Sequence, residues 1–176
     1  MIEKRLYIAY GSNLNLPQMA SRCPTAKPVG TAVLNDYELL FRGSRYGGVA
    51  TVEPREGSSV PVLVWEIRPN DENALDHYEG YPHFYGKQMM DIDLGGKTIP
   101  AMIYVMTPGF EAGYPSEHYL NIIARGYKSA GFDLGILDAA LERTEEIMAQ
   151  EMEQSAIKNK QEHDCNNSSL FDLKWW

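Results

Sequence analysis

One run of apolar residues constrains the fold more than any other part of the chain. Residues 60–67 read VPVLVWEI and are almost continuously apolar, with several β-branched side chains. A strand with one face in water alternates apolar and polar residues, whereas a run of this kind is typical of a strand covered on both sides. We therefore expect residues 60–67 to form a central strand of a sheet.

Shorter strand patterns surround this run, and turn residues separate them. We expect strands at residues 6–9, 30–34, 37–42, 49–52, 85–94 and 98–106. Turns are expected at 35–36, 56–59 and 95–97, where Asn, Asp, Gly and Ser supply the backbone conformations that turns need.

Capping residues predict where the helices lie. Three helices are expected to begin at Asn15, Asn70 and Ser116, which can cap the first turn of a helix. Pro17 suits the first turn of the first helix, and Gly131 suits the C-terminal cap of the third. A fourth helix is expected at residues 134–152, where apolar residues recur at helical spacing.

Strands with one inserted helix and two helices at the end are typical of an α+β fold. We expect a small mixed β-barrel with flanking α-helices, and Leu75 and Tyr78 on the second helix are expected to face its core. Residues 1–152 are predicted to form this single domain. Residues 153–176 are predicted to be a polar, mobile C-terminal tail, with an apolar end at 170–176 that either frays or docks on a surface.

Charge and hydropathy indicate which classes of partner the protein can bind. The 176 residues contain 16 Lys and Arg against 24 Asp and Glu, a formal charge of -8, which disfavours nucleic acid as a partner. No apolar run reaches membrane-spanning length and none resembles the core of a signal peptide, so we expect no membrane partner and a cytoplasmic location. Cys23 and Cys165 form no CxxC pair and are predicted to be free thiols. We expect a monomer or a homodimer.

Several kinds of chemistry lack their motifs in this sequence. The four histidines show no metal-ligand spacing, and neither a phosphate-binding glycine loop nor a GxSxG nucleophile motif occurs. We therefore expect no metal site and no cofactor.

The first candidate site segment is the loop at residues 10–14, which reads YGSNL. It joins an expected strand to an expected helix, so its backbone N–H groups lack partners in a helix and can converge on a carboxylate or an oxyanion. The alternative is an ordinary strand-to-helix turn.

The second candidate is Glu79, which lies among aromatic residues in the segment YEGYPHFY at 78–85. Aromatic surroundings remove water from a carboxylate and raise its pKa toward neutrality, as a general acid and base requires. The alternative is a solvated glutamate at the end of a helix, with the tyrosines in the core.

Four segments follow one another in a distinctive order. They read YIAYGSNLN at 7–15, GGVATVEP at 47–54, EGYPHFY at 79–85 and YPSEHYLNIIARGYKSAG at 114–131. Together they resemble the γ-glutamylcyclotransferase family over about residues 6–141. The resemblance implies a small β-barrel with flanking helices, and an enzyme that needs no cofactor.

The resemblance also implies a reaction and roles for individual residues. Such an enzyme cyclises the γ-glutamyl group of a γ-glutamyl amino acid or amine to 5-oxoproline and releases the free amine. Glu79 matches the family's catalytic acid and base, and Tyr10, Gly11, Ser12, Asn13 and Leu14 match its substrate-binding loop. Tyr85 and Tyr119 match family tyrosines near the site, where they could hydrogen-bond the substrate or Glu79, or could pack in the core.

Two other functions are compatible with the same sequence. The domain could bind a small ligand or a protein without turnover, although the presence of Glu79 beside an intact loop argues against this. It could also be a hydrolase that directs water to the same carbonyl group. The sequence does not choose the amine that leaves.

Overall fold

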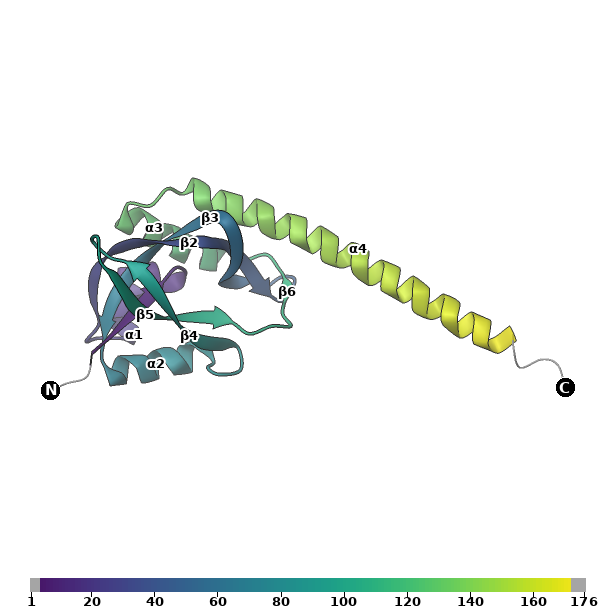
Figure 1. The fold of residues 1–176 in the computed structure, drawn as a ribbon, viewed down its shortest axis with the longest axis horizontal. Coiled ribbons are helices and arrows are strands. Elements are labelled where there is room, and N and C mark those ends of the chain that lie inside the picture. Colours follow the sequence, from purple (N-terminus) through teal and green to yellow (C-terminus); the bar gives the residue numbers. More distant parts are fainter. Residues whose placement is uncertain (1–3, 172–176) are drawn as a thin grey trace.

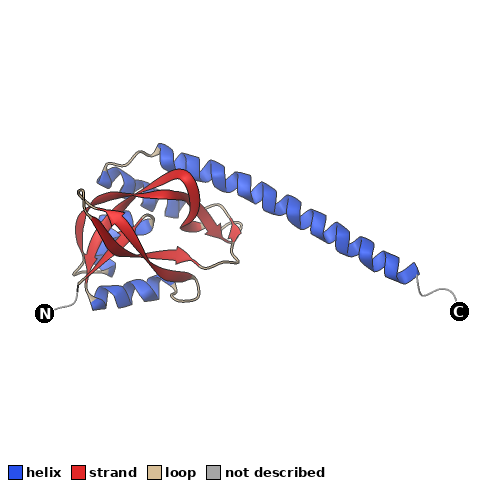
Figure 2. Cartoon of the chain, in the orientation of Figure 1, coloured by secondary structure: helices blue, strands red, loops and turns tan. Residues whose placement is uncertain are grey.

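The structure is a computed structural model that describes residues 4–171, with side chains as far as Gln161. Strands form one body with helices on its outside, and the last helix runs away from that body (Figures 1 and 2). In chain order the elements are β1 (Arg5–Ala9), the 3-10 helix η1 (Ser12–Leu14), α1 (Leu16–Arg22), β2 (Lys27–Gly43), β3 (Val49–Ile67), α2 (Pro69–Glu79), β4 (Tyr85–Asp93), β5 (Thr98–Met106), β6 (Glu111–Ala112), α3 (Glu117–Ala130) and α4 (Gly135–Phe171).

Six strands form one mixed, curled sheet in the order β4-β5-β1-β3-β2-β6. Strand β1 runs parallel to β5 and antiparallel to β3, and the remaining pairs are antiparallel. The sheet is a half-barrel with β4 and β6 at its edges. This arrangement confirms the predicted α+β class with a barrel-like core and flanking helices.

The expected central strand is confirmed. Residues 60–67 are the second half of β3, which lies between β1 and β2. Val60, Val62, Val64 and Ile67 are fully buried, because side chains pack against both faces of the sheet at this point.

The turns predicted at 35–36 and 56–59 are wrong, because β2 and β3 continue through both positions. The pairing shifts register between Asn35 and Tyr37, and Asp36 and Gly57 both have positive φ. The Gly57 N–H donates to Asp36 Oδ1 at 2.9 Å. Residues that usually make turns instead form a bulge that bends two paired strands together, and this bend curls the sheet.

Helix α2 begins differently from the prediction. Arg68, not Asn70, is its N-cap residue, and the Asp71 carboxylate accepts the backbone N–H of Arg68 at 3.0 Å. Leu75 is fully buried as expected, but Tyr78 is 45% exposed, so its predicted inward position is wrong. Tyr78 lies one residue before the end of α2, where the helix meets the surface.

The other predicted caps and the hairpin are confirmed. The side chains of Asn15 and Ser116 accept backbone N–H groups in the first turns of α1 and α3. Gly131 caps α3 with φ 73°, which is a left-handed conformation that glycine adopts without strain. Gly95 and Gly96 connect β4 to β5.

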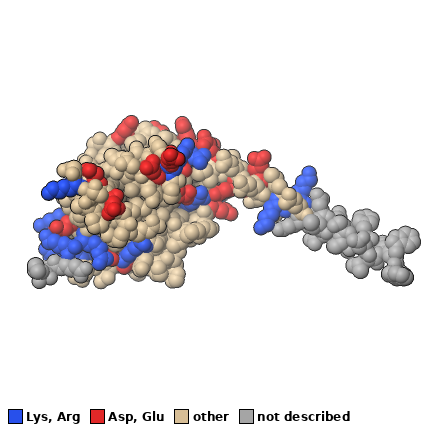
Figure 3. All heavy atoms as spheres, viewed as in Figure 1, with Lys and Arg blue, Asp and Glu red and all other residues tan. Residues whose placement is uncertain are grey.

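The predicted end of the last helix at residue 152 is wrong, because α4 continues to Phe171. No Pro or Gly occurs after Gly135 in this helix, and residues such as Glu, Gln, Lys and Ala favour helix without packing. From Met152 to Gln161 every side chain is exposed. Figure 3 shows both acidic and basic side chains along this part of α4. The apolar end predicted at 170–176 lies outside the described side chains, and the mobility of the segment stays a prediction.

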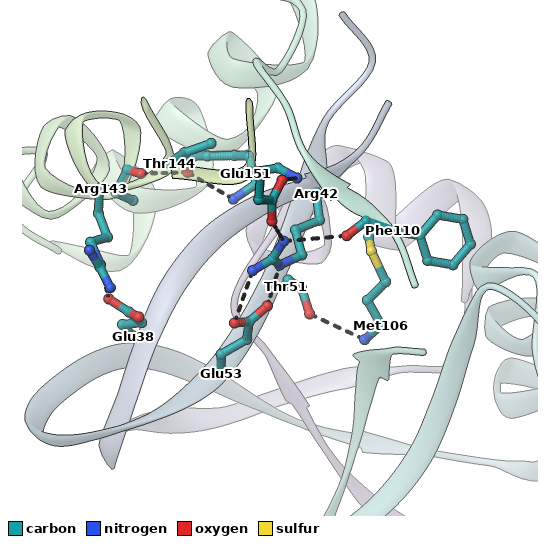
Figure 4. Close-up of polar contacts among 12 residues, drawn as sticks. Glu38, Arg42, Thr51, Glu53, Met106, Phe110, Arg143, Thr144 and Glu151 are labelled. Carbon is teal, nitrogen blue, oxygen red and sulfur yellow. Dashed lines mark hydrogen bonds and ion pairs between the residues drawn. The ribbon is translucent and has the colours of Figure 1, made fainter. Parts of the chain in front are cut away.

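Polar contacts attach the first half of α4 to the sheet (Figure 4). Thr144 is fully buried, and its Oγ1 accepts the Phe41 N–H at 3.1 Å. Two turns after Thr144, Glu151 of α4 pairs with Arg42 of β2 at 2.8 Å. Arg42 also pairs with Glu53 of β3. These contacts end where the helix leaves the body.

None of the helices in the described part of the chain combines the length and the apolar character that spanning a membrane requires.

Candidate active site

The predicted site residues come together around one small pocket at the end of β1. Seven parts of the chain contribute to it: β1, the loop after β1, β3, the last residue of α2, the start of β4, β5 and the first turn of α3. Its lining residues are Tyr7, Tyr10, Gly11, Ser12, Asn13, Ala50, Glu79, Tyr85, Tyr104 and Tyr119. Leu14 is fully buried behind the pocket and does not line it.

The loop at residues 10–14 is a single turn of 3-10 helix fixed from behind. The Leu14 N–H donates to the Gly11 carbonyl at 3.0 Å, which closes the turn. Helix α3 packs directly on this turn through Gly126. No side chain would fit at this position, since a Cβ there would lie 2.5 Å from Leu14 Cβ. The first N–H group to donate within the turn is that of Leu14. The N–H groups of Gly11, Ser12 and Asn13 come before it, so they have no acceptor within the turn.

Glu79 is the last residue of α2 and is partly buried in the pocket. The next residue, Gly80, ends the helix in a left-handed conformation with φ 62°. Burial raises the pKa of Glu79 from 4.5 to about 7, although the positive charge of Arg22 and a hydrogen bond from Asn13 lower it. A carboxyl group with this pKa can take a proton and return it near neutral pH.

Asn13 connects the loop to Glu79 through its side chain. Its Nδ2 donates to Glu79 Oε1 at 2.9 Å and to the Tyr7 hydroxyl at 2.8 Å. The sequence predicted a role for the backbone of this loop, and the structure adds this side-chain contact across 66 residues of sequence.

Tyr85 and Tyr119 reach the pocket but contact a backbone group, and neither is hydrogen-bonded to Glu79. The Tyr85 hydroxyl donates to the Ala50 carbonyl at 2.6 Å, and the Tyr119 hydroxyl accepts the Ala50 N–H at 3.2 Å. Burial raises the pKa of both hydroxyls, so both stay protonated in the neutral range. The two rings therefore position the Ala50 peptide at the pocket wall while their hydroxyl groups remain beside the cavity.

Tyr10 contributes to the pocket wall through its ring. Its hydroxyl donates to the Tyr104 carbonyl at 2.6 Å, and burial raises its pKa well above 10. Ser12 is buried, and its Oγ lies 3.1 Å from the Tyr78 hydroxyl.

Sequence reasoning missed five residues at or beside the pocket. Ala50 lies in one of the four segments that carry the family resemblance, so a signal for it was present. Tyr7 and Tyr104 resemble ordinary core residues of strands, and Tyr78 was expected inside. No local pattern marks Arg22, whose guanidinium group lies over the Tyr78 ring, 3.3 Å from its centroid.

Among the described residues, no group of three or more His, Cys, Asp or Glu side chains could hold a metal ion. Cys23 is buried, and burial raises the pKa of its thiol to about 11. Cys165 lies outside the described side chains.

Comparisons with known proteins decide the family. The family model described as gamma-glutamyl cyclotransferase, AIG2-like, matches residues 7–126. The chain belongs to this family. A gamma-glutamylcyclotransferase of Homo sapiens is 33% identical over 141 residues, which cover 75% of this chain and 74% of the human protein.

Solved structures agree with the family at the level of the fold. One named gamma-glutamyl cyclotransferase is 32% identical and covers 84% of this chain and 88% of its own, with a TM-score of 0.69. YkqA from Bacillus subtilis is 22% identical, with a TM-score of 0.64, and shares the fold; the match covers 84% of this chain and 55% of YkqA. The expected resemblance, the half-barrel fold and an enzyme of the gamma-glutamylcyclotransferase kind are thereby confirmed.

Proposed function

We propose that this enzyme cyclises the γ-glutamyl group of a γ-glutamyl amino acid or γ-glutamyl amine to 5-oxoproline and releases the free amine. One observation carries the proposal. In one pocket, Glu79, whose pKa is raised to about 7, lies beside the turn whose first N–H groups have no partner within it. Such a pair supplies both a proton acceptor and donors for a developing oxyanion.

The reaction begins with the α-amino group of the glutamyl substrate. Its neutral nitrogen attacks the γ-carbonyl carbon and closes a five-membered ring, and Glu79 accepts one of its two protons as the new C–N bond forms, so that the ring nitrogen keeps the single hydrogen of 5-oxoproline. The attack is intramolecular, so a pocket that holds the substrate curled supplies most of the catalytic advantage through proximity. The negative charge moves to the carbonyl oxygen, where N–H groups of Gly11, Ser12 and Asn13 donate to it.

The second step breaks the amide bond to the leaving group. The tetrahedral intermediate collapses, the C–N bond to the amine breaks, and protonated Glu79 returns its proton to the departing nitrogen. The products are 5-oxoproline and the free amine, and Glu79 is a carboxylate again. No water enters, which distinguishes this reaction from hydrolysis to glutamate.

The pocket tyrosines have the hydrogen-bonding capacity to orient the substrate. Tyr119 accepts a bond from Ala50, so its own hydrogen is available for a carboxylate of the substrate. Tyr85 donates its hydrogen to Ala50, so its oxygen is available to accept from the substrate amino group. From the loop at 10–14, Tyr10 lines the pocket, and the buried Leu14 supports the loop from behind.

The experiment is a product analysis by mass spectrometry with wild type and Glu79→Gln side by side. The panel contains γ-glutamyl-alanine, γ-glutamyl-ε-lysine, a γ-glutamyl alkylamine and glutathione. We expect wild type to release 5-oxoproline from at least one member and the variant to lose this release. Free glutamate would instead indicate a hydrolase. No turnover of any member would favour a domain that binds a small ligand or a protein without turnover.

We also propose that residues 1–152 contain the whole catalytic unit. All side chains from Met152 to Gln161 are exposed, and the contacts of α4 with the body end at about Glu151. A chain shortened after Gln154 keeps these contacts and is expected to retain wild-type kcat/KM. A loss of activity would assign the rest of α4 a role in the site or in assembly.

A further inference from the structure

Arg22 lies beside the candidate site without lining the pocket. It is the last residue of α1, and its guanidinium group stacks on the exposed Tyr78 ring of α2. One of its nitrogens, Nη1, donates to Asn13 Oδ1, and another lies 3.5 Å from Gln18 Oε1. Arg22 thus connects α1, the loop after β1 and the end of α2.

The bond from Arg22 determines which way the Asn13 amide points. A guanidinium group has only donors, so it must face the amide oxygen. The amide nitrogen is then directed at the Tyr7 hydroxyl and at Glu79. In the reversed orientation, the guanidinium group would face the amide NH2, and the amide oxygen would face the Glu79 carboxylate. Both of these contacts are unfavourable, because donors would meet donors and acceptors would meet acceptors.

The electrostatic surroundings of Glu79 give Arg22 a second effect. The ionisable groups that interact with Glu79 are Arg22 from α1, Cys23 just after it, Tyr7 and Tyr10 at the end of β1, Tyr85 from β4 and Tyr119 from α3. Burial raises the pKa of the tyrosines and of the thiol, so these groups are neutral near pH 7. Arg22 is the cation of this set, and its charge opposes the effect of burial on Glu79.

We propose that Arg22 is a positioning residue for the reaction: through Asn13 it orients the amide donor toward Glu79, and through its charge it keeps the Glu79 carboxylate available as a base. Arg22 contacts neither Glu79 nor the pocket interior directly. This inference rests on the proposed function, because it assigns a role relative to Glu79 as the base.

A planar guanidinium group suits this position better than an ammonium group. It can donate in its own plane to Asn13 while its face stacks on Tyr78. Lysine would retain the charge but would lose the stacking and the fixed direction of the bond. The two effects of Arg22 can therefore be separated by substitution.

The test compares Arg22→Met, Arg22→Lys and the control Arg55→Met in the full chain. Arg55 is an exposed arginine paired with Glu38 on the bend of β2 and β3, so its loss changes the net charge equally but away from the pocket. The measurement is kcat and KM from pH 5 to 9, with a γ-glutamyl substrate that wild type turns over.

We expect Arg22→Met to lower kcat at least tenfold with KM within threefold of wild type. Its acidic limb of kcat/KM is expected to move upward by roughly one pH unit, because the cation that favours ionised Glu79 is gone. Arg22→Lys is expected to return the limb to the wild-type position while kcat stays below wild type. Arg55→Met is expected to match wild type throughout.

Two results would overturn the proposal. If the acidic limb of the kcat/KM profile of Arg22→Met stays at the wild-type pH and kcat is unchanged, Arg22 has no role in the reaction. An increase in KM alone would make Arg22 a substrate-binding residue.

A second measurement does not depend on turnover. The carboxyl carbon of Glu79 can be titrated by NMR in 13C-glutamate-labelled protein, with the resonance assigned by its absence in Glu79→Gln. We expect its pKa to rise in Arg22→Met and to return toward the wild-type value in Arg22→Lys. An unchanged titration would refute the proposal on Arg22, whereas an active Glu79→Gln enzyme would refute the proposed function.

Discussion

Helix α2 carries a carboxyl group near each of its ends, one buried and one partly buried, and the two groups have different surroundings. Asp71 in the first turn accepts three hydrogen bonds, from the Thr25 N–H and hydroxyl and from the Arg68 N–H. Glu79 at the last residue accepts one from the described residues, namely from Asn13. The helix dipole stabilises a negative charge at the first position and destabilises it at the second.

The difference separates a carboxylate that several donors hold from the carboxyl group that we propose as the acid and base. Asp71 is 2% exposed, and its bonds join the loop between α1 and β2 to the N-terminus of α2. Glu79 has few such bonds and little water, so burial raises its pKa to about 7. A carboxyl group thus accepts three hydrogen bonds at one end of α2 and has a pKa near neutrality at the other, as the proposed proton transfer requires.

The largest effect is expected when the two carboxylates are changed to amides in parallel. Glu79→Gln is expected to lower kcat/KM by roughly 10²–10⁴-fold, because the amide cannot accept the proton. Asp71→Asn is expected to keep kcat/KM within a few-fold of wild type in protein that remains folded. Steady-state kinetics on both variants check this, and equal losses would mean that Asp71 also serves the reaction.

The second prediction concerns stability. Asp71→Ala leaves the Thr25 and Arg68 donors without their acceptor, and we expect the free energy of unfolding to fall by about 3 kcal/mol. Urea denaturation at pH 7 measures the change, with Glu79→Gln as the matched comparison. If the free energy of unfolding falls by a similar amount in Glu79→Gln, the carboxyl groups at the two ends of α2 do not differ in their contribution to stability, and the prediction is wrong.

The third prediction is a pH dependence of stability. The pKa of Glu79 is raised in the folded state, so folding favours its protonated form, and this contribution to stability declines as pH rises from about 4.5 to about 7. Glu79→Gln lacks the titration. Its free energy of unfolding relative to wild type is therefore expected to increase by about 2 kcal/mol between pH 4.5 and pH 8, after allowance for the partial exposure of Glu79.

Urea denaturation at a series of pH values tests this third prediction. A constant difference between wild type and Glu79→Gln across the whole range would show that the folded state does not perturb Glu79.

The smallest expected effect comes from one donor to Asp71. Thr25→Val removes the hydroxyl that donates to Asp71 Oδ2 at 2.5 Å, and we expect a loss of about 1 kcal/mol in the free energy of unfolding. Thermal denaturation checks the change, and kcat/KM should stay at the wild-type value. A change in kcat/KM without a loss of stability would connect this end of α2 to the site.

Local chemistry made much of the molecule predictable. A continuous apolar run predicted the central strand, and Asn15, Ser116 and Gly131 predicted helix ends, because each of these signals depends on a few neighbouring residues. The loop at 10–14 and Glu79 were selected for the same reason, since the backbone donors and the aromatic neighbours are close in sequence. The structure places both at one pocket.

Signals that depend on packing were misread. Asp36 and Gly57 were expected in turns, but the two strands bend together there and remain paired. The apolar periodicity of α4 stops at about residue 152 because contact with the sheet stops, and the helix itself continues on intrinsic propensity. Periodicity therefore reported where the helix is buried and not where it ends.

The sequence alone determined the family, the position of most strands and helices along the chain, and the two segments that could do chemistry, because these follow from short stretches of residues. Only the tertiary structure decided how the site is connected. The orientation of the Asn13 amide depends on Arg22, and the hydroxyl groups of Tyr85 and Tyr119 are directed by Ala50. These partners come from separate elements, and hydrogen bonds between them exist only after the sheet has curled and brought their atoms within about 3 Å.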